Sequence, residues 1–503
     1  MKSTWKKLLA LACVICLLMA QFAACSPTTE PTEETTQATT EPAAEATAAE
    51  PAATEDVYAI SGTVSIAYPE GEVAEIQPVL EAFRAQYPNV TVEEVPFAGS
   101  TGGAFNEFLT QRAAANDMPD MMWLDWNDFA PEVASGFVMP LNDLIAGDPD
   151  AEYVPAGMTD PYTYNGKLYA LPCQMNAMGI TINLDMLDAL NIERPSYDWT
   201  FAEFEELLKK AISADTVGAA TLEDLDQVYS AQAAGFMYPA YDAVNQTFDF
   251  TNKWVPAMNK LAELRAIPGL EAWSMRFPKN EDGTTSLDSD YVAKFGEAGK
   301  DDNHYTFKNG MALLCTNATW NDNWMRSECT VNWDYWPYPR LDENTPVYTP
   351  IHVDCAYLTS TCAEPEVAFQ LLKWLTYGVE GNLQRLDIFA ARGDAQAAEG
   401  DTKLLKTWFI PCTQNPDVLA KFEQNTHLTE GFKALYRSTE NSIRGDLNKI
   451  LPGYSAIFTD EVNALINSVR NGEASAADVG PQIDALVNPA LAEQLAAFNE
   501  KVQ

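Results

Sequence analysis

The sequence predicts an α/β fold, in which parallel strands alternate with helices. Two segments, 63–68 and 90–95, alternate apolar and polar residues, which is typical of half-buried strands. Between them, apolar residues recur every three or four positions, which predicts an amphipathic helix. These residues are Ile76, Val79, Leu80, Phe83 and Tyr87. The order strand, helix, strand predicts a parallel pair joined by a right-handed crossover.

The later segments continue this alternation. Thr200 and Glu203 have the spacing of a capping box, which predicts that a helix begins at residue 201. Asn165-Gly166 is a turn pattern between two short extended segments, 162–164 and 167–172. The other predicted elements are a helix at 104–115, a strand at 121–125, a strand at 177–183, a helix at 184–190, a mostly helical stretch at 221–305, an α/β stretch at 311–375 and a helical tail from about 383.

The N-terminus has the features of an export signal. Three lysines, the last of them Lys7, precede an apolar run at 8–19 that is too short to cross a bilayer stably. Phe22-Ala23-Ala24-Cys25 follows and resembles the lipobox of bacterial lipoproteins, although the usual first residue is Leu. We therefore predict that 1–24 is a signal peptide and that Cys25 is the lipidation site. The alternative is an ordinary secretory signal in which Cys25 has no special role.

The segment that follows Cys25 has the composition of a tether. Residues 26–56 contain only Ser, Pro, Thr, Glu, Ala, Gln and Asp, and therefore no aromatic or branched aliphatic side chain. Such a segment cannot bury enough apolar surface to offset the entropy cost of ordering. We predict a disordered tether over 25–56, with a reach of about 30 Å as a random coil and about 95 Å when extended.

The charge of the chain restricts its partners. The full sequence carries −41, of which the signal peptide contributes +3 and the tether −8, which leaves −36 on residues 57–503. A field of this sign repels nucleic acid and anionic lipid surfaces, so we expect no nucleic-acid partner. Neutral or cationic ligands are easier to accommodate. The negative net charge does not exclude a pocket that is locally positive.

The cysteines and histidines do not form a metal-binding pattern. The chain has only three histidines, and the six cysteines of residues 57–503 include no CxxC, so we expect neither a metal nor a cofactor. Outside the membrane the body cysteines could form up to three disulfides, or they could stay reduced as small core residues. We favour the reduced form. The body cysteines are Cys173, Cys315, Cys329, Cys355, Cys362 and Cys412.

The sequence also lacks the common catalytic motifs. It contains no GxSxG, no HExxH, no P-loop and no GxGxxG after a strand. Carboxylates are numerous enough to include a glycosidase pair, but nothing in the sequence singles one out. We therefore predict a binding protein rather than an enzyme, with an extracellular glycan hydrolase as the alternative.

Several short motifs occur in a characteristic order along the body. They are the segments 62–96, 119–122, 136–141, 164–172, 183–187, 199–204, 307–312 and 366–375. In this order they resemble the extracellular solute-binding proteins of ABC importers, the family that includes maltose- and oligosaccharide-binding proteins. The resemblance implies two α/β lobes with a ligand cleft between them, a monomer, and delivery of a solute to ABC permease subunits.

The resemblance also implies where the chain crosses between the lobes. The expected crossings lie near 173–176, 332–336 and 377–381. Lobe 1 would then comprise 57–173 plus 335–377, and lobe 2 would comprise 174–334 plus 378–503. Loops at the carboxyl ends of parallel strands are where α/β sheets present groups to ligands, so the site is expected there.

Candidate ligand-binding residues follow the predicted strands or lie at a crossing. Trp126 and Trp320 suit a sugar, because the C–H face of a sugar ring packs on an aromatic ring. Gln174 and Asn176 both donate and accept hydrogen bonds, as hydroxyl recognition requires. The full set is Tyr68, Glu70, Glu72, Asp125, Trp126, Asn127, Gln174, Asn176, Trp320, Asn321, His352 and Asp354.

Each candidate has an alternative role. Glu70 and Glu72 could belong to a solvated turn, Trp126 could pack between the lobes, and His352 could lie at a strand edge. Three further aromatics are expected in the core or on the lobe surface. These are Tyr238, Trp273 and Trp408.

Together these observations predict a lipid-anchored substrate-binding subunit of an ABC importer on the extracellular face of a bacterial membrane. The expected ligand is a mono- or oligosaccharide. A binding module that serves a sensor system is a further alternative.

Overall fold

The computed structural model describes residues 57–99, 102–125, 128–234, 240–276, 289–299 and 302–502. They belong to one compact unit, 56–503. The predicted signal peptide, tether and Cys25 lie outside the described residues, as do Trp126, Asn127 and Tyr238. Within the described ranges, no helix combines the length and apolar character needed to cross a membrane.

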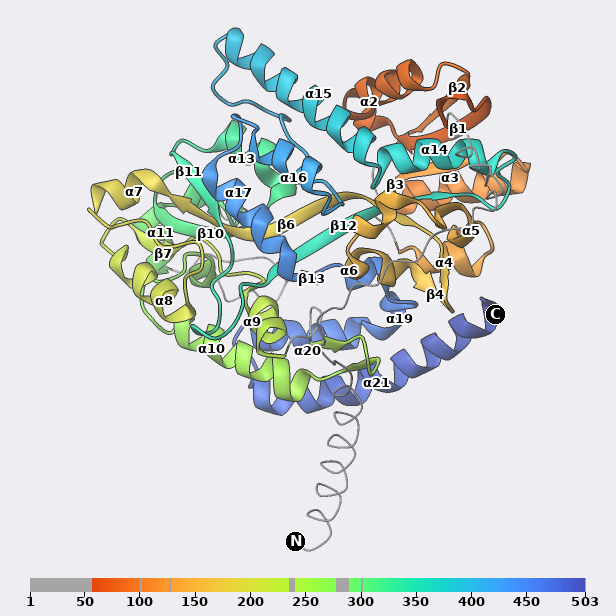
Figure 1. Ribbon diagram of the computed structural model, residues 1–503. Helices are drawn as coiled ribbons and strands as arrows, with labels where there is room; N and C mark the ends of the chain where they lie inside the picture. The colour runs from red at the N-terminus through yellow and green to blue at the C-terminus, as the bar shows by residue number, and fades with distance from the viewer. Residues whose placement is uncertain are drawn as a thin grey trace, which may run out of the picture. The chain divides into compact units, whose positions relative to one another are not determined.

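The described residues form an α/β structure, as predicted (Figure 1). The strands are β1 Gly62–Pro69, β2 Val90–Phe97, β3 Met121–Asp125, β4 Thr163–Tyr164, β5 Lys167–Leu168, β6 Leu171–Asn183, β7 Val217–Ala219, β8 Tyr241–Asp242, β9 Thr247–Phe248, β10 Ala312–Ala318, β11 Trp333–Trp336, β12 Thr349–Leu358 and β13 Ser442–Arg444. Nine of them form one mixed sheet with the order β2-β1-β3-β12-β6-β10-β7, in which β11 pairs with β6 and β13 with β12.

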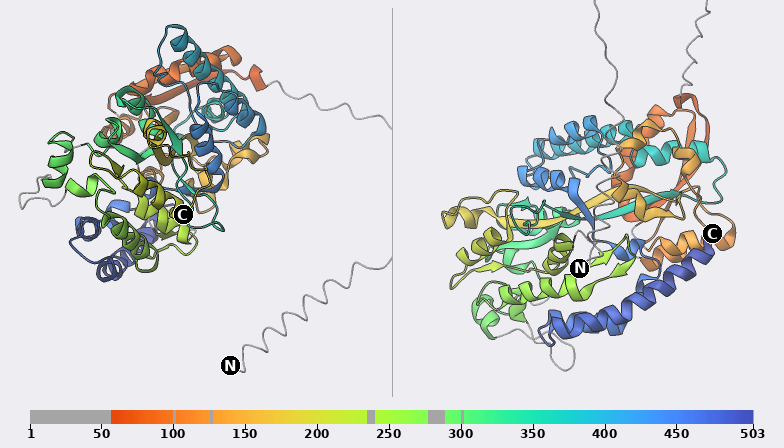
Figure 2. Two further views of the ribbon diagram at one scale, coloured as in Figure 1. Left: turned by 90° about the vertical axis from the view of Figure 1, so that its left-hand side faces the viewer. Right: turned by 60° about the horizontal axis from the view of Figure 1, so that its bottom comes forward.

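Helices connect and cover these strands. The α-helices are α2 Val73–Gln86, α3 Gly102–Ala115, α4 Ala130–Ala134, α5 Asn142–Ile145, α6 Ala156–Thr159, α7 Leu184–Ala189, α8 Phe201–Lys210, α9 Leu225–Ala234, α10 Val255–Arg265, α11 Ser289–Phe295, α12 Tyr305–Lys308, α13 Asp322–Glu328, α14 Pro365–Leu375, α15 Val379–Ala398, α16 Pro416–Glu423, α17 Glu430–Arg437, α18 Leu447–Ile450, α19 Tyr454–Ile457, α20 Asp460–Arg470 and α21 Ala476–Lys501. Two short 3-10 turns matter for the site, η2 Glu70–Glu72 and η7 Thr319–Asn321. Figure 2 shows the dark blue α21 on the opposite side of the sheet from the lighter blue α15.

Local sequence patterns produce the predicted local structures. Strands β1 and β2 are parallel and α2 connects them, which confirms the predicted strand–helix–strand unit. Thr200 and Glu203 form both bonds of the capping box at the start of α8. Asn165 and Gly166 both have positive φ values, 50° and 74°, in the turn between β4 and β5. This backbone conformation is the reason that Asn-Gly favours such turns.

The two long strands β6 and β12 run side by side through the middle of the sheet (Figure 1). They pair antiparallel from Ile351 opposite Ala177 to Ala356 opposite Leu171, with a register shift after Asp354. Beyond this ladder, β12 pairs with β3, and the carboxyl half of β6 pairs with β10 and β11. Together the two long strands therefore join the β1–β3 part of the sheet to the β7–β10 part, because β12 pairs with β3 and β6 pairs with β10.

The predicted crossings fall on different elements. Residues 173–176 lie in β6, and 332–336 lead into and form β11, which pairs with the carboxyl end of β6. Residues 377–381 lie between α14 and the first turn of α15. The lobe bounds 57–173 plus 335–377 and 174–334 plus 378–503 stay predictions.

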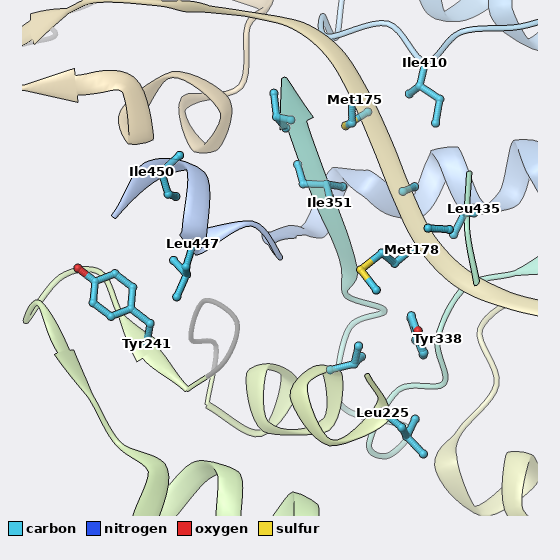
Figure 3. Close-up of a cluster of buried hydrophobic side chains, with 14 of the residues drawn as sticks. Met175, Met178, Leu225, Tyr241, Tyr338, Ile351, Ile410, Leu435, Leu447 and Ile450 are labelled. Atoms are coloured by element: carbon cyan, nitrogen blue, oxygen red, sulfur yellow. The ribbon is translucent and has the colours of Figure 1, made fainter. Parts of the chain in front are cut away.

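Buried apolar side chains pack on both long strands. Figure 3 shows Met175 and Met178 of β6 near Ile351 of β12, in a cluster that continues into α18 and α17. These three side chains are at most 4% exposed. A separate cluster packs around β1, β3, α2 and α14. All six body cysteines are free thiols, in agreement with the favoured reduced form.

A buried ion pair joins β12, β13 and α18. Arg444 and Asp446 are 3% and 0% exposed, and the Arg444 Nε donates to Asp446 Oδ1 at 2.6 Å. Asp446 Oδ2 also accepts from Arg444 Nη2 at 2.9 Å and from the Val353 backbone N–H at 2.8 Å. On α18, Lys449 forms a second buried ion pair with Asp354. These bonds attach the C-terminal region to the centre of β12.

We predict that Asp446→Asn strongly destabilises the protein. The substitution leaves the Arg444 guanidinium buried without a counter-charge, which typically costs about 3–5 kcal/mol. Chemical denaturation of both proteins measures this loss as a difference in the free energy of unfolding. Glu206→Gln is the matched control, because Glu206 is 67% exposed in its pair with Lys209 and should change the stability by less than about 0.5 kcal/mol. A loss for Asp446→Asn no larger than that of the control would contradict this role.

Candidate functional site

A cavity of about 280 Å³ brings together polar and aromatic side chains from distant parts of the sequence. Its walls come from η2 and α2, from β6, from η7 and α13, from α15, and from the loop between α15 and α16. The lining residues are Glu72, Glu75, Gln174, Met175, Asn176, Thr319, Trp320, Asn323, Arg385, Phe389, Lys406, Trp408, Phe409 and Ile410. We call this cavity the β6 pocket.

The Asn176 amide of the β6 pocket is held by Thr319, the first residue of η7. The Thr319 hydroxyl donates to Asn176 Oδ1 at 3.1 Å and accepts from the Ala177 backbone N–H, also at 3.1 Å. This leaves the Asn176 amide nitrogen available as a donor on an otherwise fixed side chain. Gln174, two residues earlier in β6, lines the same pocket and is only partly buried.

Trp320 presents a large aromatic surface at the pocket. It is 47% exposed, although it lies only two residues after the buried strand β10. The His352 ring lies against it, with 4.8 Å between ring centroids and an interplanar angle of 63°. Burial lowers the pKa of His352 to about 4, so this ring is neutral at pH 7. Trp320 is thus supported at one edge by an uncharged ring while its exposed surface remains available.

Ion pairs order one wall of the pocket. Glu75 of α2 accepts from Arg392 Nη1 at 2.9 Å and 3.2 Å and from Lys406 Nζ at 3.1 Å. Glu72 lies one turn earlier, and burial raises the pKa of its carboxyl group, while the nearby Lys406 charge opposes this shift. These contacts connect η2 and α2 to α15 and to the loop that carries Lys406.

Arg385 of α15 lines the pocket from its buried side. It is 6% exposed, and its Nη1 donates to the Cys173 carbonyl at 3.2 Å. The guanidinium lies over the Phe409 ring, 4.2 Å from the centroid, which is a favourable cation–π distance. Burial lowers the pKa of Arg385 from its ordinary value.

The loop before α16 adds aromatic side chains. Trp408 Nε1 donates to the buried Asp322 carboxylate at 2.9 Å, which fixes the orientation of the indole. The backbone N–H of Lys406 donates to Asn323 Oδ1 at 2.6 Å, so α13 and this loop hold each other in place. Trp408, expected in the core or on the surface, packs against the core and also lines the pocket.

Four of the predicted ligand-binding residues line the β6 pocket: Glu72, Gln174, Asn176 and Trp320. His352 and Asn321 are near neighbours, since His352 contacts the Trp320 ring and Asn321 follows it in η7. The Asn321 amide donates to Asn317 Oδ1 at 3.0 Å.

Other predicted residues lie away from the pocket. Tyr68 is 1% exposed in the core, and its hydroxyl donates to Glu94. Glu70 is exposed on η2. Asp354 is buried and forms an ion pair with Lys449, while burial raises the pKa of its carboxyl group. Asp125 is buried near Glu132, and its charge adds to the burial that raises the pKa of Glu132 well above the ordinary value.

Sequence reasoning missed several lining residues. Asn323 lies three positions after Trp320, so the segment around Trp320 contained a cue for it. Arg385 and Lys406 lie in the stretch that was assigned only as a helical tail. Nothing in their local sequence marks them, because they reach the pocket only through the packing of α15 against α2.

A larger cavity of about 760 Å³ lies elsewhere in the described structure. It is lined mainly by the β4–β5 and β8–β9 hairpins, α18 and α21, and contains none of the predicted ligand-binding residues. The β6 pocket is the stronger candidate, because amides of β6, charged side chains and the exposed Trp320 line it together, as expected for ligand sites of α/β sheets.

The side chains that line the β6 pocket are suited to binding a polar ligand. Its amides, carboxylates and cations supply hydrogen-bond donors and acceptors, and Trp320 supplies a flat apolar face. This combination suits a solute rich in hydroxyl groups. Among the described residues, no group of three or more His, Cys, Asp or Glu side chains is arranged to hold a metal ion.

Solved structures share this fold. A sugar transporter from Rhizobium etli in an open conformation has a TM-score of 0.63 and 18% identity, and the match covers 85% of this chain and 99% of that one. An ABC substrate-binding protein from Listeria monocytogenes in complex with cycloalternan has a TM-score of 0.59 and 18% identity, with 86% and 100% covered. The GacH receptor of Streptomyces glaucescens has a TM-score of 0.58 and 18% identity, with 86% and 99% covered.

These similarities confirm the predicted fold class, the two-lobed α/β fold of periplasmic binding proteins. The family model for bacterial extracellular solute-binding proteins matches residues 68–376, which is more than half of the chain. That family is a class of binding proteins rather than of enzymes. The chain therefore belongs to the bacterial extracellular solute-binding proteins.

Proposed function

We propose that this protein is the substrate-binding subunit of an ABC importer and that it captures a carbohydrate in the β6 pocket. The observation that carries the proposal is the half-exposed Trp320 beside the amides of Gln174 and Asn176. A sugar ring needs both kinds of contact, because its C–H face is apolar and its edge carries hydroxyl groups. Structures of similar fold support the choice, since the Listeria monocytogenes protein binds cycloalternan and the GacH receptor binds acarbose.

The position of the pocket suggests how ligand binding changes the conformation that a permease recognises. Its residues come both from elements that pack on β1 and from elements that follow β10, and these are joined by β6 and β12. A ligand that contacts both groups stabilises the arrangement in which they are close together. Function then consists of a population shift towards a closed form that a permease recognises.

The N-terminal segment completes the proposal. Lipid attached at Cys25 would hold the protein on the extracellular face of the membrane, and the segment 25–56 would act as the tether. A tether of this length keeps a monomeric binding protein within about 30–95 Å of its permease, which raises the effective concentration without fixing the orientation.

Ligand-dependent thermal stability tests the proposed function. The panel consists of neutral and acidic mono- and oligosaccharides, with amino acids, peptides and polyamines as non-carbohydrate probes. We expect at least one saccharide to raise the melting temperature, because a ligand at a hundred times its Kd adds about 2.7 kcal/mol of stability. Stabilisation by a non-carbohydrate probe alone would overturn the carbohydrate assignment.

Trp320→Ala tests the role of the stacking surface. We expect it to weaken binding of the stabilising saccharide by about tenfold or more, with nearly no change in the melting temperature of the free protein. Trp324→Ala is the matched control, since Trp324 is 38% exposed one helical turn later and does not line the pocket. Isothermal titration calorimetry gives both affinities. Equal affinities of the two variants, or a large loss of stability in unliganded Trp320→Ala, would assign Trp320 a structural role.

Cys25→Ser tests the anchor. We expect the wild-type protein to remain in the membrane fraction and to incorporate a labelled fatty acid, whereas the variant is released into the medium or periplasm. Cys173→Ser is the control, because Cys173 is buried in β6 and inaccessible to a lipid-transferring enzyme. Membrane association of Cys25→Ser equal to that of the wild type would show that Cys25 is not the anchor.

A further inference from the structure

Arg385 differs from three other arginines of the described structure, whose side chains are at most 19% exposed, in its lack of a counter-charge. Arg265, Arg326 and Arg444 each place Nε within 2.6–2.7 Å of a carboxylate that is itself fully buried. Arg385 is 6% exposed, yet no carboxylate of the described residues comes within 4.0 Å of it. Burying an unpaired charge is unfavourable, so an ion partner is expected at this position.

The protein groups around Arg385 compensate for its burial only in part. The Cys173 carbonyl accepts from Nη1, and the Phe409 ring stacks against the guanidinium. Both contacts stabilise a cation, but neither carries a negative charge. Accordingly, burial lowers the pKa of Arg385, whereas the carboxylate partners of Arg265, Arg326 and Arg444 raise theirs.

The nearest acidic side chains are Glu72 and Glu75. Glu75 already binds two other cations, Arg392 and Lys406. Glu72 acts on Arg385 only at longer range and is itself disfavoured as an anion by burial. Two cations, Arg385 and Lys406, and the two glutamates line the pocket, and Lys406 and Arg392 both pair with Glu75, so Arg385 is the lining cation without a carboxylate partner among the described residues.

We infer that the ligand bears a carboxylate that binds Arg385, which makes the preferred substrate an acidic saccharide of the uronic acid type. This inference rests on the proposed carbohydrate function. A guanidinium offers parallel N–H donors that match the two oxygens of a carboxylate. One unpaired cation balances the single charge of a carboxylate rather than the double charge of a phosphate. Trp320 and the amides of β6 then bind the sugar ring.

Matched pairs of sugars test the inference. The probes are D-galacturonic acid with D-galactose and D-glucuronic acid with D-glucose, each also as the di- and trisaccharide. We expect at least one acidic member to bind with a Kd about tenfold lower than that of its neutral counterpart, because a charged hydrogen-bonded pair is formed. Neutral members that bind as tightly as the acidic ones would overturn the inference and leave the proposed function intact. If no saccharide binds, both fail.

Arg385→Gln separates charge from hydrogen bonding. We expect the Kd for the acidic sugar to rise about tenfold, while the Kd for its neutral counterpart changes less than about threefold. The melting temperature of the unliganded variant should equal or exceed that of the wild type, because a buried charge without a counter-ion has been removed. Arg437→Gln is the control, since Arg437 is 51% exposed on α17 outside the pocket.

Lys406→Gln provides a second test that does not depend on a core position. Its side chain is 45% exposed, so the variant should fold even if Arg385→Gln does not. We expect it to weaken binding of the acidic sugar more than binding of the neutral one. Calorimetric titrations measure both affinities. If either variant weakens binding of acidic and neutral sugars equally, the positive charge does not contribute to recognition, and the inference is wrong.

Discussion

The pairing of β6 with β12 is the constraint on which the rest of the structure depends. These two strands form an antiparallel ladder in the middle of the sheet, and each continues past it to pair with strands of a different part. A shift of one residue would turn every side chain of β6 to the opposite face. Asn176 would then leave the pocket, and Met175 would leave the core shown in Figure 3.

Buried charges lie beside both strands of this ladder. Those beside β12 are paired, whereas Arg385 beside β6 has no counter-charge among the described residues. Asp446 accepts hydrogen bonds from both Arg444 and the Val353 backbone, so the C-terminal region is attached to β12 by a buried ion pair. Arg385 packs beside β6 through the Cys173 carbonyl but lacks such a partner. The first arrangement stabilises the fold by itself, whereas the second is completed when a ligand supplies an anion.

Residues of the candidate site could be predicted from the sequence only where they lie in a strand or close after one. Trp320 was selected because it lies close after a strand, and Gln174 and Asn176 because they lie at an expected crossing. All three line the β6 pocket. The same reasoning selected Tyr68 and Asp354, which the structure buries against Glu94 and Lys449. A position at or near a strand end fixes neither the direction of a side chain nor the elements that cover it, so burial could not be read from the pattern.

The sequence by itself determined the α/β class, the capping box at Thr200 and the Asn165-Gly166 turn, because these depend on periodicity and on bonds between near neighbours. Its order of motifs also indicated the family. Only the tertiary structure decided which charges meet: Arg385 and Lys406 reach the pocket through packing of α15 and its following loop against α2. Such contacts join residues more than 300 positions apart, and no local pattern encodes them. The charge balance of the site is therefore a property of the fold.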